Sequence, residues 1–190
     1  MQLTQQFKEA LDYALELHRG QQRKGSDTPY MAHLLAVASL VLEDGGDEEQ
    51  AIAALLHDAP EDQGGLETLA AIRQRFGDRV ADIVHGCTDT YETPKPPWRQ
   101  RKEAYLEHLQ SATEEVCRVS LADKLHNARS LMTDLLRSGE DVWDRFNGGK
   151  AGTLWYYHSL LEVFRYRCNS PLVAELGFVL QRIDSLLADS

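Results

Sequence analysis

The sequence has few cysteines and no long apolar run, and both absences restrict the class of protein. Its three cysteines, Cys87, Cys117 and Cys168, are odd in number and widely spaced, so neither a disulfide framework nor a cysteine-based zinc site is expected. No apolar run approaches the roughly 20 residues that span a bilayer, and residues 1–6 lack the basic and apolar regions of a signal peptide. We therefore expect a cytoplasmic protein without membrane contact.

Positive charge is also scarce. The 190 residues include 20 Lys and Arg against 30 Asp and Glu, which gives a net charge of −10. Because a nucleic-acid-binding surface would be basic, we expect no nucleic-acid partner. A small anionic substrate is compatible with this charge if its pocket is locally positive. Four basic residues close to the motifs described below could supply such a pocket: Arg23, Lys24, Lys124 and Arg129.

Period-two alternation, internal repeats and low-complexity segments are absent from the sequence, whereas helical periodicity covers nearly all of it. Glycine pairs and one proline-rich loop at residues 93–97 separate the helical segments. The predicted helices span about residues 4–19, 29–43, 47–57, 66–76, 79–86, 98–110, 114–136, 141–146, 152–167 and 171–188. A chain of this length can bury one sizeable core. We predict an all-α, single-domain helical bundle over residues 1–190.

The predicted helix that begins after Asp47 is almost wholly apolar and ends in ionisable residues. Asp47, with Gln50 three residues later, resembles a capping box at its start. The apolar run Ala51–Leu56 then leads directly into a His-Asp pair. Pro60 ends or kinks the helix, which places the two carboxylates that follow it on the emerging turn.

Four residues of the predicted helices form a candidate metal site. His57 and Asp58 end the apolar helix, where a buried charge needs a partner or a metal. His33 lies beside the apolar stripe of an earlier helix, and Asp123 interrupts the apolar residues of a later one. Two imidazoles and two carboxylates suit one Mn²⁺, Fe²⁺ or Zn²⁺ ion, and indicate metal-assisted hydrolysis of a phosphate ester. Two further carboxylates remain for proton transfer: Glu61 and Asp62.

These residues also have plainer interpretations. Each histidine can be a hydrogen-bonded core residue, and Asp123 can form a buried salt bridge with a neighbouring Lys or Arg. His126 is expected to orient a metal ligand rather than to bind the metal. Lys150 and the run Trp155–Tyr157 are open to two interpretations: phosphate clamp and aromatic wall of a pocket, or helix residues that pack in the core.

The motifs occur in a recognisable order: Arg23-Lys24-Gly25, Pro29-Tyr30-Met31-Ala32-His33, Ala53-Ala54-Leu55-Leu56-His57-Asp58, Glu61-Asp62 and Leu121-Ala122-Asp123-Lys124-Leu125-His126-Asn127-Ala128-Arg129. This order resembles the HD-type hydrolase domain of the RelA/SpoT family, and most of all its small stand-alone hydrolases of guanosine tetra- and pentaphosphate, (p)ppGpp. The resemblance covers about residues 7–136. It implies a single HD hydrolase domain, with helices at about residues 139–188 packing on the motif-bearing part.

The resemblance also implies a role for each site residue. Four side chains would bind Mn²⁺: His33, His57, Asp58 and Asp123. Two carboxylates would position or activate the attacking water: Glu61 and Asp62. Arg23 would pack on the guanine base, and Lys24 would contact the base or the phosphates. Asn127 would contact the nucleotide near the ribose, and Ser130 stands where the family usually has Thr.

The implied activity is a Mn²⁺-dependent 3′-pyrophosphohydrolase that converts (p)ppGpp to GDP or GTP and pyrophosphate, as part of the stringent response. Four departures from the family pattern leave the metal ligands intact but alter the pocket rim: Leu34, Ala59-Pro60, Gln63 and Cys87-Thr88-Asp89. Two alternatives therefore stay open. The first is an HD phosphohydrolase for another 3′-phosphorylated nucleotide, such as an adenosine analogue or NADPH. The second is a non-catalytic nucleotide-binding module. The oligomeric state is left undetermined.

Overall fold

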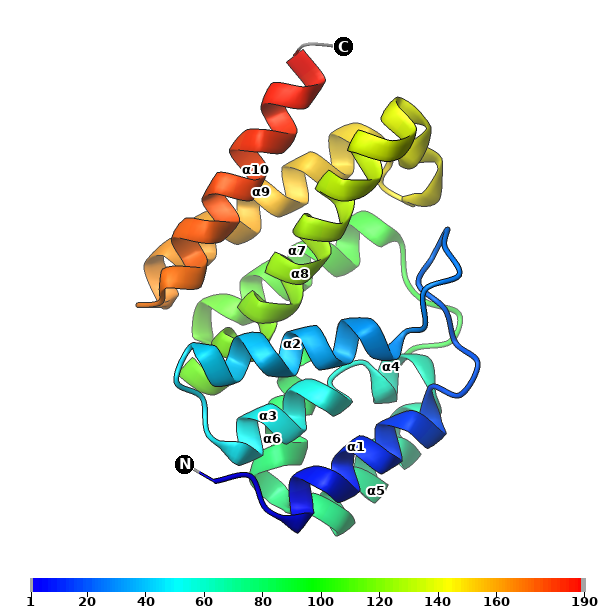
Figure 1. The fold of residues 1–190 in the computed structure, drawn as a ribbon, viewed down its shortest axis with the longest axis vertical. Coiled ribbons are helices and arrows are strands. Elements are labelled where there is room, and N and C mark those ends of the chain that lie inside the picture. Colours follow the sequence, from blue (N-terminus) through cyan, green and yellow to red (C-terminus); the bar gives the residue numbers. More distant parts are fainter. Residues whose placement is uncertain (1, 189–190) are drawn as a thin grey trace.

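The computed structural model describes residues 2–188, and these form helices joined by short loops (Figure 1). The elements are α1 (Gln5–Leu17), α2 (Met31–Glu43), α3 (Glu48–Leu56), α4 (Ala59–Asp62), α5 (Gly65–Phe76), α6 (Asp78–Cys87), α7 (Trp98–Ser111), α8 (Glu114–Ser138), the 3₁₀ helix η1 (Gly139–Arg145), α9 (Gly149–Arg167) and α10 (Pro171–Ala188). Within this part of the chain there is no strand, only an isolated bridge between Gln22 and Pro29. The all-α prediction is confirmed.

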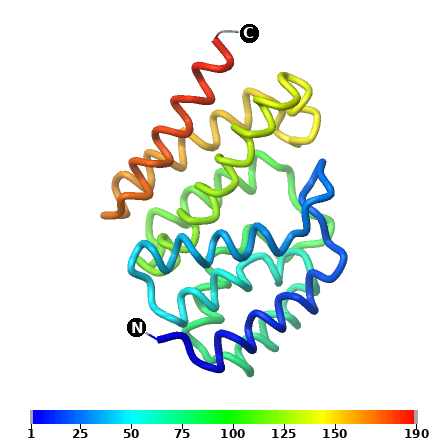
Figure 2. Tube along the Cα trace, in the orientation of Figure 1, coloured from blue at the N-terminus to red at the C-terminus, as the bar shows by residue number. Residues whose placement is uncertain are grey.

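The helices pack in two groups that α8 joins. The first six helices form the N-terminal part, where α3 packs against α1, α2 and α6. The C-terminal helices α9 and α10 pack against each other and against α8, at the opposite end of the molecule (Figure 1). Helix α8 also contacts α2, α3 and α6. The continuous trace in Figure 2 shows α2 crossing between the two groups.

Helix α3 is the centre of the N-terminal part because, from Ala51 to Leu56, it is apolar on every side. All residues of Ala51–Leu56 have no exposed surface. A helix without a polar face must be surrounded by other helices, and this is how α3 carries the following His57-Asp58 pair into the interior. None of the helices described combines the length and apolar character needed to cross a bilayer.

The capping box predicted at the start of α3 is only half formed. The Asp47 carboxylate accepts a hydrogen bond from the backbone N–H of Gln50 at 3.0 Å, as a helix N-cap should. The Gln50 side chain does not complete the box. It donates to Glu115 at 3.3 Å and accepts from Arg118 at 2.9 Å, so it links α3 to α8 instead.

Two predicted helix starts and one helix type were inaccurate. Helix α2 begins at Met31 rather than Pro29, because the residues before it pair with the preceding loop, with the Tyr30 N–H donating to the Gln21 carbonyl at 2.9 Å. Helix α9 begins at Gly149, three residues before the predicted Gly152. The segment predicted as a helix at residues 141–146 is the 3₁₀ helix η1.

Candidate metal centre

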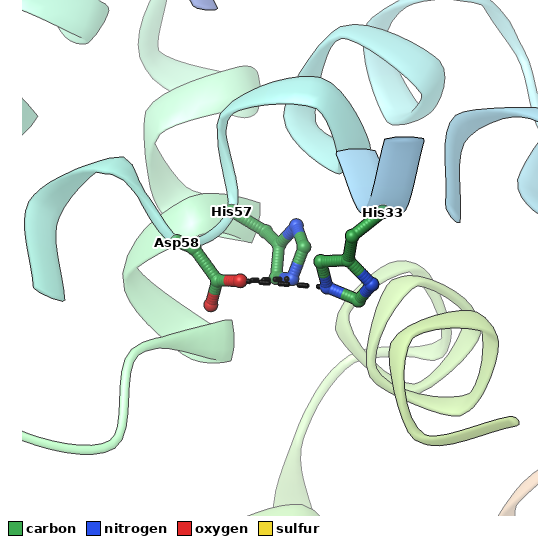
Figure 3. A group of neighbouring side chains, drawn as sticks. All are labelled: His33, His57 and Asp58. Atoms are coloured by element: carbon green, nitrogen blue, oxygen red, sulfur yellow. Dashed lines mark ion pairs between the residues drawn. The ribbon is translucent and has the colours of Figure 1, made fainter. Parts of the chain in front are cut away.

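Four side chains from different parts of the chain meet at one point. His33 comes from α2, His57 and Asp58 from the link between α3 and α4, and Asp123 from α8. The Nε2 atom of His57 lies 3.1 Å from an Asp58 oxygen and 3.6 Å from an Asp123 oxygen. The Nε2 atom of His33 lies 3.5 Å and 3.2 Å from the same two oxygens. Figure 3 shows His33, His57 and Asp58 pointing toward one another.

One ligand atom each of His33, His57 and Asp58 lies within 4.8 Å of the others, which fits a divalent cation, and Asp123 lies beside this group. An ion at about 2.0–2.2 Å from each nitrogen and oxygen ligand holds neighbouring ligand atoms about 3–3.5 Å apart, which matches the observed spacing. The Nε2 atoms of His33 and His57 are buried and have no hydrogen-bond partner, although carboxylate oxygens lie near them. Both nitrogens therefore face the space that the two carboxylates border.

The remaining ring nitrogens hold the two imidazoles in place. His57 Nδ1–H donates to the carbonyl oxygen of Ala54 at 2.8 Å, which leaves the Nε2 lone pair free to bind a metal. His33 Nδ1 lies 2.7 Å from Nδ1 of His126. Burial and the neighbouring His33 lower the pKa of His126 to about 4, so this partner is neutral. His126 thus lies behind His33, away from the metal position.

The electrostatics of the site favour a cation. Burial opposes a positive charge on His57, but the carboxylates of Asp58 and Asp123 outweigh it and raise the pKa of His57 well above its usual range. Burial also opposes negative charge on the two carboxyls. His57 nevertheless lowers the pKa of Asp58, and Lys124 that of Asp123, well below the usual range. A divalent cation at this position would balance the negative charges of Asp58 and Asp123 and would leave the imidazoles neutral.

Each carboxylate has a second partner. The Tyr30 hydroxyl donates to Asp58 at 2.6 Å. Lys124 and Asn127 donate to Asp123 at 2.6 and 2.5 Å. The plainer interpretation of Asp123, a buried salt bridge with a neighbouring lysine, thus coexists with its place beside the histidines. The role of Tyr30 was missed, although its position three residues before His33 puts both on one side of the chain where α2 begins.

The carboxylates of Glu61 and Asp62 lie in α4, directly after the candidate metal ligands. Asp62 accepts a hydrogen bond from the Gln21 side chain at 2.8 Å, and burial together with the charge of Asp58 raises the pKa of Asp62. Glu61 pairs with Lys95 at 2.8 Å. Lys95 belongs to the proline-rich loop, so that loop lies beside the site.

A basic cavity of about 680 Å³ adjoins the metal position, and His33 lines it. All four predicted substrate-binding residues line this cavity: Arg23, Lys24, Asn127 and Ser130. The remaining cations that line it are Lys102, Lys124, Arg129, Arg137 and Arg145, against the single lining carboxylate of Asp134. The cavity is locally positive in a chain of net charge −10, as a small anionic ligand requires.

Several residues that line the cavity also form hydrogen bonds with one another. Arg23 donates to the Asn127 side chain at 2.7 Å, and its guanidinium lies 5.7 Å from the centre of the Tyr30 ring. The Ser130 hydroxyl donates to the carbonyl oxygen of His126 at 3.0 Å. These bonds hold Arg23 and Asn127 beside the metal position before any ligand is present.

Sequence analysis left two interpretations open for Lys150 and the run Trp155–Tyr157: residues of the pocket or residues of the core. The structure gives different answers for different residues. Tyr156 and Tyr157 are buried and line the cavity. Trp155 instead faces the Arg99 guanidinium, 3.2 Å from the ring centre. Lys150 is outside the cavity lining and pairs with Glu140 at 2.6 Å. Sequence analysis missed the cavity residues Lys102, Arg137 and Arg145, which no local motif marks.

Comparison with known proteins gives consistent results. The family model described as "HD domain" matches residues 10–154. The guanosine-3′,5′-bis(diphosphate) 3′-pyrophosphohydrolase MESH1 of Xenopus tropicalis is 40% identical over 138 residues, 71% of this chain and 72% of that protein. The guanosine-3′,5′-bis(diphosphate) 3′-pyrophosphohydrolase of Aquifex aeolicus is 37% identical over 133 residues, 68% of this chain but 18% of that protein. A solved structure, described as a metazoan ortholog of SpoT that hydrolyses ppGpp, has the same fold, with a TM-score of 0.77, 24% identity, and coverage of 96% of this chain and 97% of that one.

Proposed function

Because this chain belongs to the HD domain family and aligns with its ppGpp-hydrolysing members, we propose that it is a metal-dependent guanosine-3′,5′-bis(diphosphate) 3′-pyrophosphohydrolase. Its products are GDP or GTP and pyrophosphate. The observation that carries the proposal is the pair of unpartnered histidine nitrogens facing two carboxylates, beside a cavity lined by cations.

The metal is held by four side chains: His33, His57, Asp58 and Asp123. A divalent cation bound there activates water and polarises the phosphoryl oxygens. We assign Mn²⁺, while the nitrogen and oxygen donors also suit Fe²⁺ or Zn²⁺. Tyr30 donates to the Asp58 oxygen that faces the two histidine nitrogens, and Lys124 donates to the Asp123 oxygen that faces away from them, so both carboxylates are held in place where they would bind the metal.

The carboxylates of α4 handle the water and the proton. Asp62 has a raised pKa and is positioned by Gln21, so it is suited to take up a proton and return it. Glu61, held by Lys95, orients the attacking water. The water attacks the phosphorus that is joined to the ribose 3′ oxygen. The bond between this phosphorus and the 3′ oxygen breaks, and the proton passes to the 3′ oxygen.

The nucleotide occupies the basic cavity. The planar Arg23 guanidinium packs on the purine base, and Asn127 contacts the ribose as donor and acceptor. Lys24 and Ser130 contact the base or the phosphates. The cations farther along the cavity neutralise the 5′ phosphates. The proposed substrates are therefore small anionic nucleotides. The proposal includes no nucleic acid or membrane as a partner. It treats the chain as one cytoplasmic HD hydrolase domain.

The test is to incubate Mn²⁺-loaded protein with ppGpp and to measure GDP and pyrophosphate. We expect release of both, loss of activity with EDTA, and a decrease of more than about 100-fold in His57→Ala, because even the partners of metal ligands typically contribute 10- to 100-fold. His158→Ala is the control, because His158 pairs with Asp184 at an exposed site. In Glu61→Ala, turnover falls while metal content stays near that of the unmodified protein.

Two results would contradict this assignment. If the metal-loaded protein releases no product from ppGpp, a panel of 3′-phosphorylated adenosine nucleotides and NADPH identifies the alternative substrate. If it binds ppGpp tightly and hydrolyses none of these nucleotides, the chain is a binding module. Loss of metal in Glu61→Ala would contradict the division of roles between metal ligands and proton-handling carboxylates.

A further inference from the structure

One buried histidine, His18, lies next to the candidate metal centre without being one of its four ligands. It caps the C-terminal end of α1 and is 2% exposed. Its ring stacks on the Tyr30 ring, with 5.2 Å between the centroids and 19° between the planes. The Nε2 atom is buried without a hydrogen-bond partner, whereas Nδ1 lies 2.7 Å from Oε1 of Gln21. Only one ring nitrogen is therefore engaged.

The Gln21 amide connects this imidazole to a carboxylate of α4. Gln21 Nε2 donates to Oδ2 of Asp62 at 2.8 Å, and Gln21 Oε1 accepts from the Gln63 amide at 2.7 Å. An ionised carboxylate only accepts hydrogen bonds, so the Gln21 nitrogen must face Asp62 and its oxygen must face His18. The Nδ1 atom of His18 therefore carries a proton and donates to Gln21. The contacts form a directed chain from His18 through Gln21 to Asp62.

Two donors on one oxygen fix the orientation of the Gln21 amide. His18 and Gln63 both donate to Oε1. If the amide turned by half a rotation, its oxygen would face the Asp62 carboxylate and its nitrogen would face two other donors. All three hydrogen bonds of the amide would be lost, and leaving such groups unsatisfied costs free energy. The amide is therefore held with its N–H directed at Asp62.

We propose that His18 is a positioning residue, which holds the Asp62 carboxylate in place through the Gln21 amide. The inference rests on the proposed function, in which Asp62 takes up and returns the proton. Gln21 occupies Oδ2 of Asp62, so Oδ1 is the oxygen left to exchange the proton with water. A shift of about 1 Å in such a group can cost about 100-fold in rate. His18 itself is outside the lining of the basic cavity and acts only through Gln21.

Two substitutions separate the donor of His18 from its ring. His18→Phe keeps a ring that can stack on Tyr30 but removes the Nδ1–H donor. His18→Asn loses the ring but carries an amide N–H close to the position of Nδ1. In metal-loaded protein with ppGpp, we expect kcat of His18→Phe to fall about 10- to 100-fold with KM and metal content unchanged. His18→Asn should retain most of the activity.

A ring that served only to pack would give the opposite order, with His18→Phe active and His18→Asn impaired, and that order would overturn the proposal. His85→Phe is the matched control. His85 also stacks on a tyrosine, Tyr91, with 5.6 Å between the ring centroids, but lies outside the candidate metal centre. Its kcat should equal that of the unmodified chain.

A double substitution tests whether His18 acts through Gln21. Gln21→Leu removes the amide, so kcat should fall. Adding His18→Phe to Gln21→Leu should then cause no further decrease, because two residues of one network are not additive. If the two decreases multiply instead, His18 acts by another route and the proposal is wrong.

A second readout does not depend on turnover. Nitrogen-15 NMR of the histidine side chains, with Zn²⁺ in place of the paramagnetic Mn²⁺, reports which ring nitrogen carries the proton. The His18 signals are assigned by their absence in His18→Phe. We expect a proton on Nδ1 at mildly alkaline pH, and loss of this preference in Gln21→Leu.

A proton on Nε2 alone in the unmodified chain would overturn the proposal, whatever the activity. If Nδ1 carries the proton but the unmodified protein does not hydrolyse ppGpp, the proposed function fails while the positioning of Asp62 by His18 stands. The two failures are therefore distinguishable.

Discussion

At the scale of single residues, Tyr30 is a direct partner of the candidate metal ligand Asp58. Its hydroxyl donates to Asp58 at 2.6 Å, and burial and the Asp58 charge raise the Tyr30 pKa, so the hydroxyl stays a donor. We expect Tyr30→Phe to weaken Mn²⁺ binding about 10- to 100-fold, because partners that orient metal ligands typically contribute this much. Titration with a competing chelator measures it.

A matched control for this variant is Tyr91→Phe. The Tyr91 hydroxyl also lies beside a histidine nitrogen, His85 Nδ1 at 2.8 Å, and its ring stacks on that imidazole, but neither residue belongs to the metal centre. Its Mn²⁺ affinity should equal that of the unmodified chain. Equal affinity in Tyr30→Phe as well would show that Asp58 needs no orientation by the phenol.

Sequence reasoning found the candidate metal ligands and expected His126 beside one of them, but it missed Tyr30. His57 and Asp58 were recognisable because a run of apolar residues leads directly into them, so a buried charge could be inferred from local sequence alone. The contact between Tyr30 and Asp58 depends on how α2 packs on α3, which no local pattern states.

At the scale of helices, the joint between α6 and α8 is closely packed around Gly86. A Cβ atom at Gly86 would lie 2.5 Å from a methyl carbon of Val116. Valine has little freedom at χ1, so the helices must separate. We expect Gly86→Ala to lower the free energy of unfolding by about 1–3 kcal/mol, as overpacked cores do. Urea denaturation of the two proteins measures this difference.

Gly177→Ala is the matched control, because Gly177 is also inside a helix, α10, but its added Cβ would meet side-chain atoms only at 3.8 Å and beyond. Alanine favours helix over glycine by up to about 1 kcal/mol, so this variant should be slightly more stable than the unmodified chain. If Gly86→Ala were as stable as Gly177→Ala, the inferred overpacking against Val116 would be wrong.

The helices themselves were largely predictable, and the errors have local causes. Helix α10 begins at the predicted residue because Pro171 follows Ser170, whose hydroxyl accepts a hydrogen bond from the Leu172 N–H at 3.1 Å. Helix α2 begins later than predicted because Pro29 is engaged in the bridge with Gln22. That bridge is a pairing across a loop, and helical periodicity gives no information about it.

At the scale of the whole molecule, the distribution of charge matters more than its total. The chain carries a net charge of −10, yet cations from α7, α8, η1 and the loop before α2 line one cavity. Composition could not locate this cavity, because Lys24, Lys102 and Arg145 are distant in sequence. Their convergence depends on how the C-terminal helices pack against α8, a part of the chain in which the RelA/SpoT motifs are weakest.

The candidate metal centre joins three distant segments of the chain, so metal binding should stabilise the whole fold. A ligand that binds only the folded state, at a concentration 100 times its Kd, contributes about 2.7 kcal/mol, which corresponds to a rise in Tm of roughly 5–10 °C for a chain of this size. We expect this rise when Mn²⁺ is added to chelator-treated protein, and its reversal by EDTA. Asp58→Ala should show no such rise, since it removes one ligand oxygen and leaves the other helices in place. If Mn²⁺ raised the Tm of Asp58→Ala as much as that of the unmodified chain, the ion would be binding elsewhere, and the four side chains would not be its site.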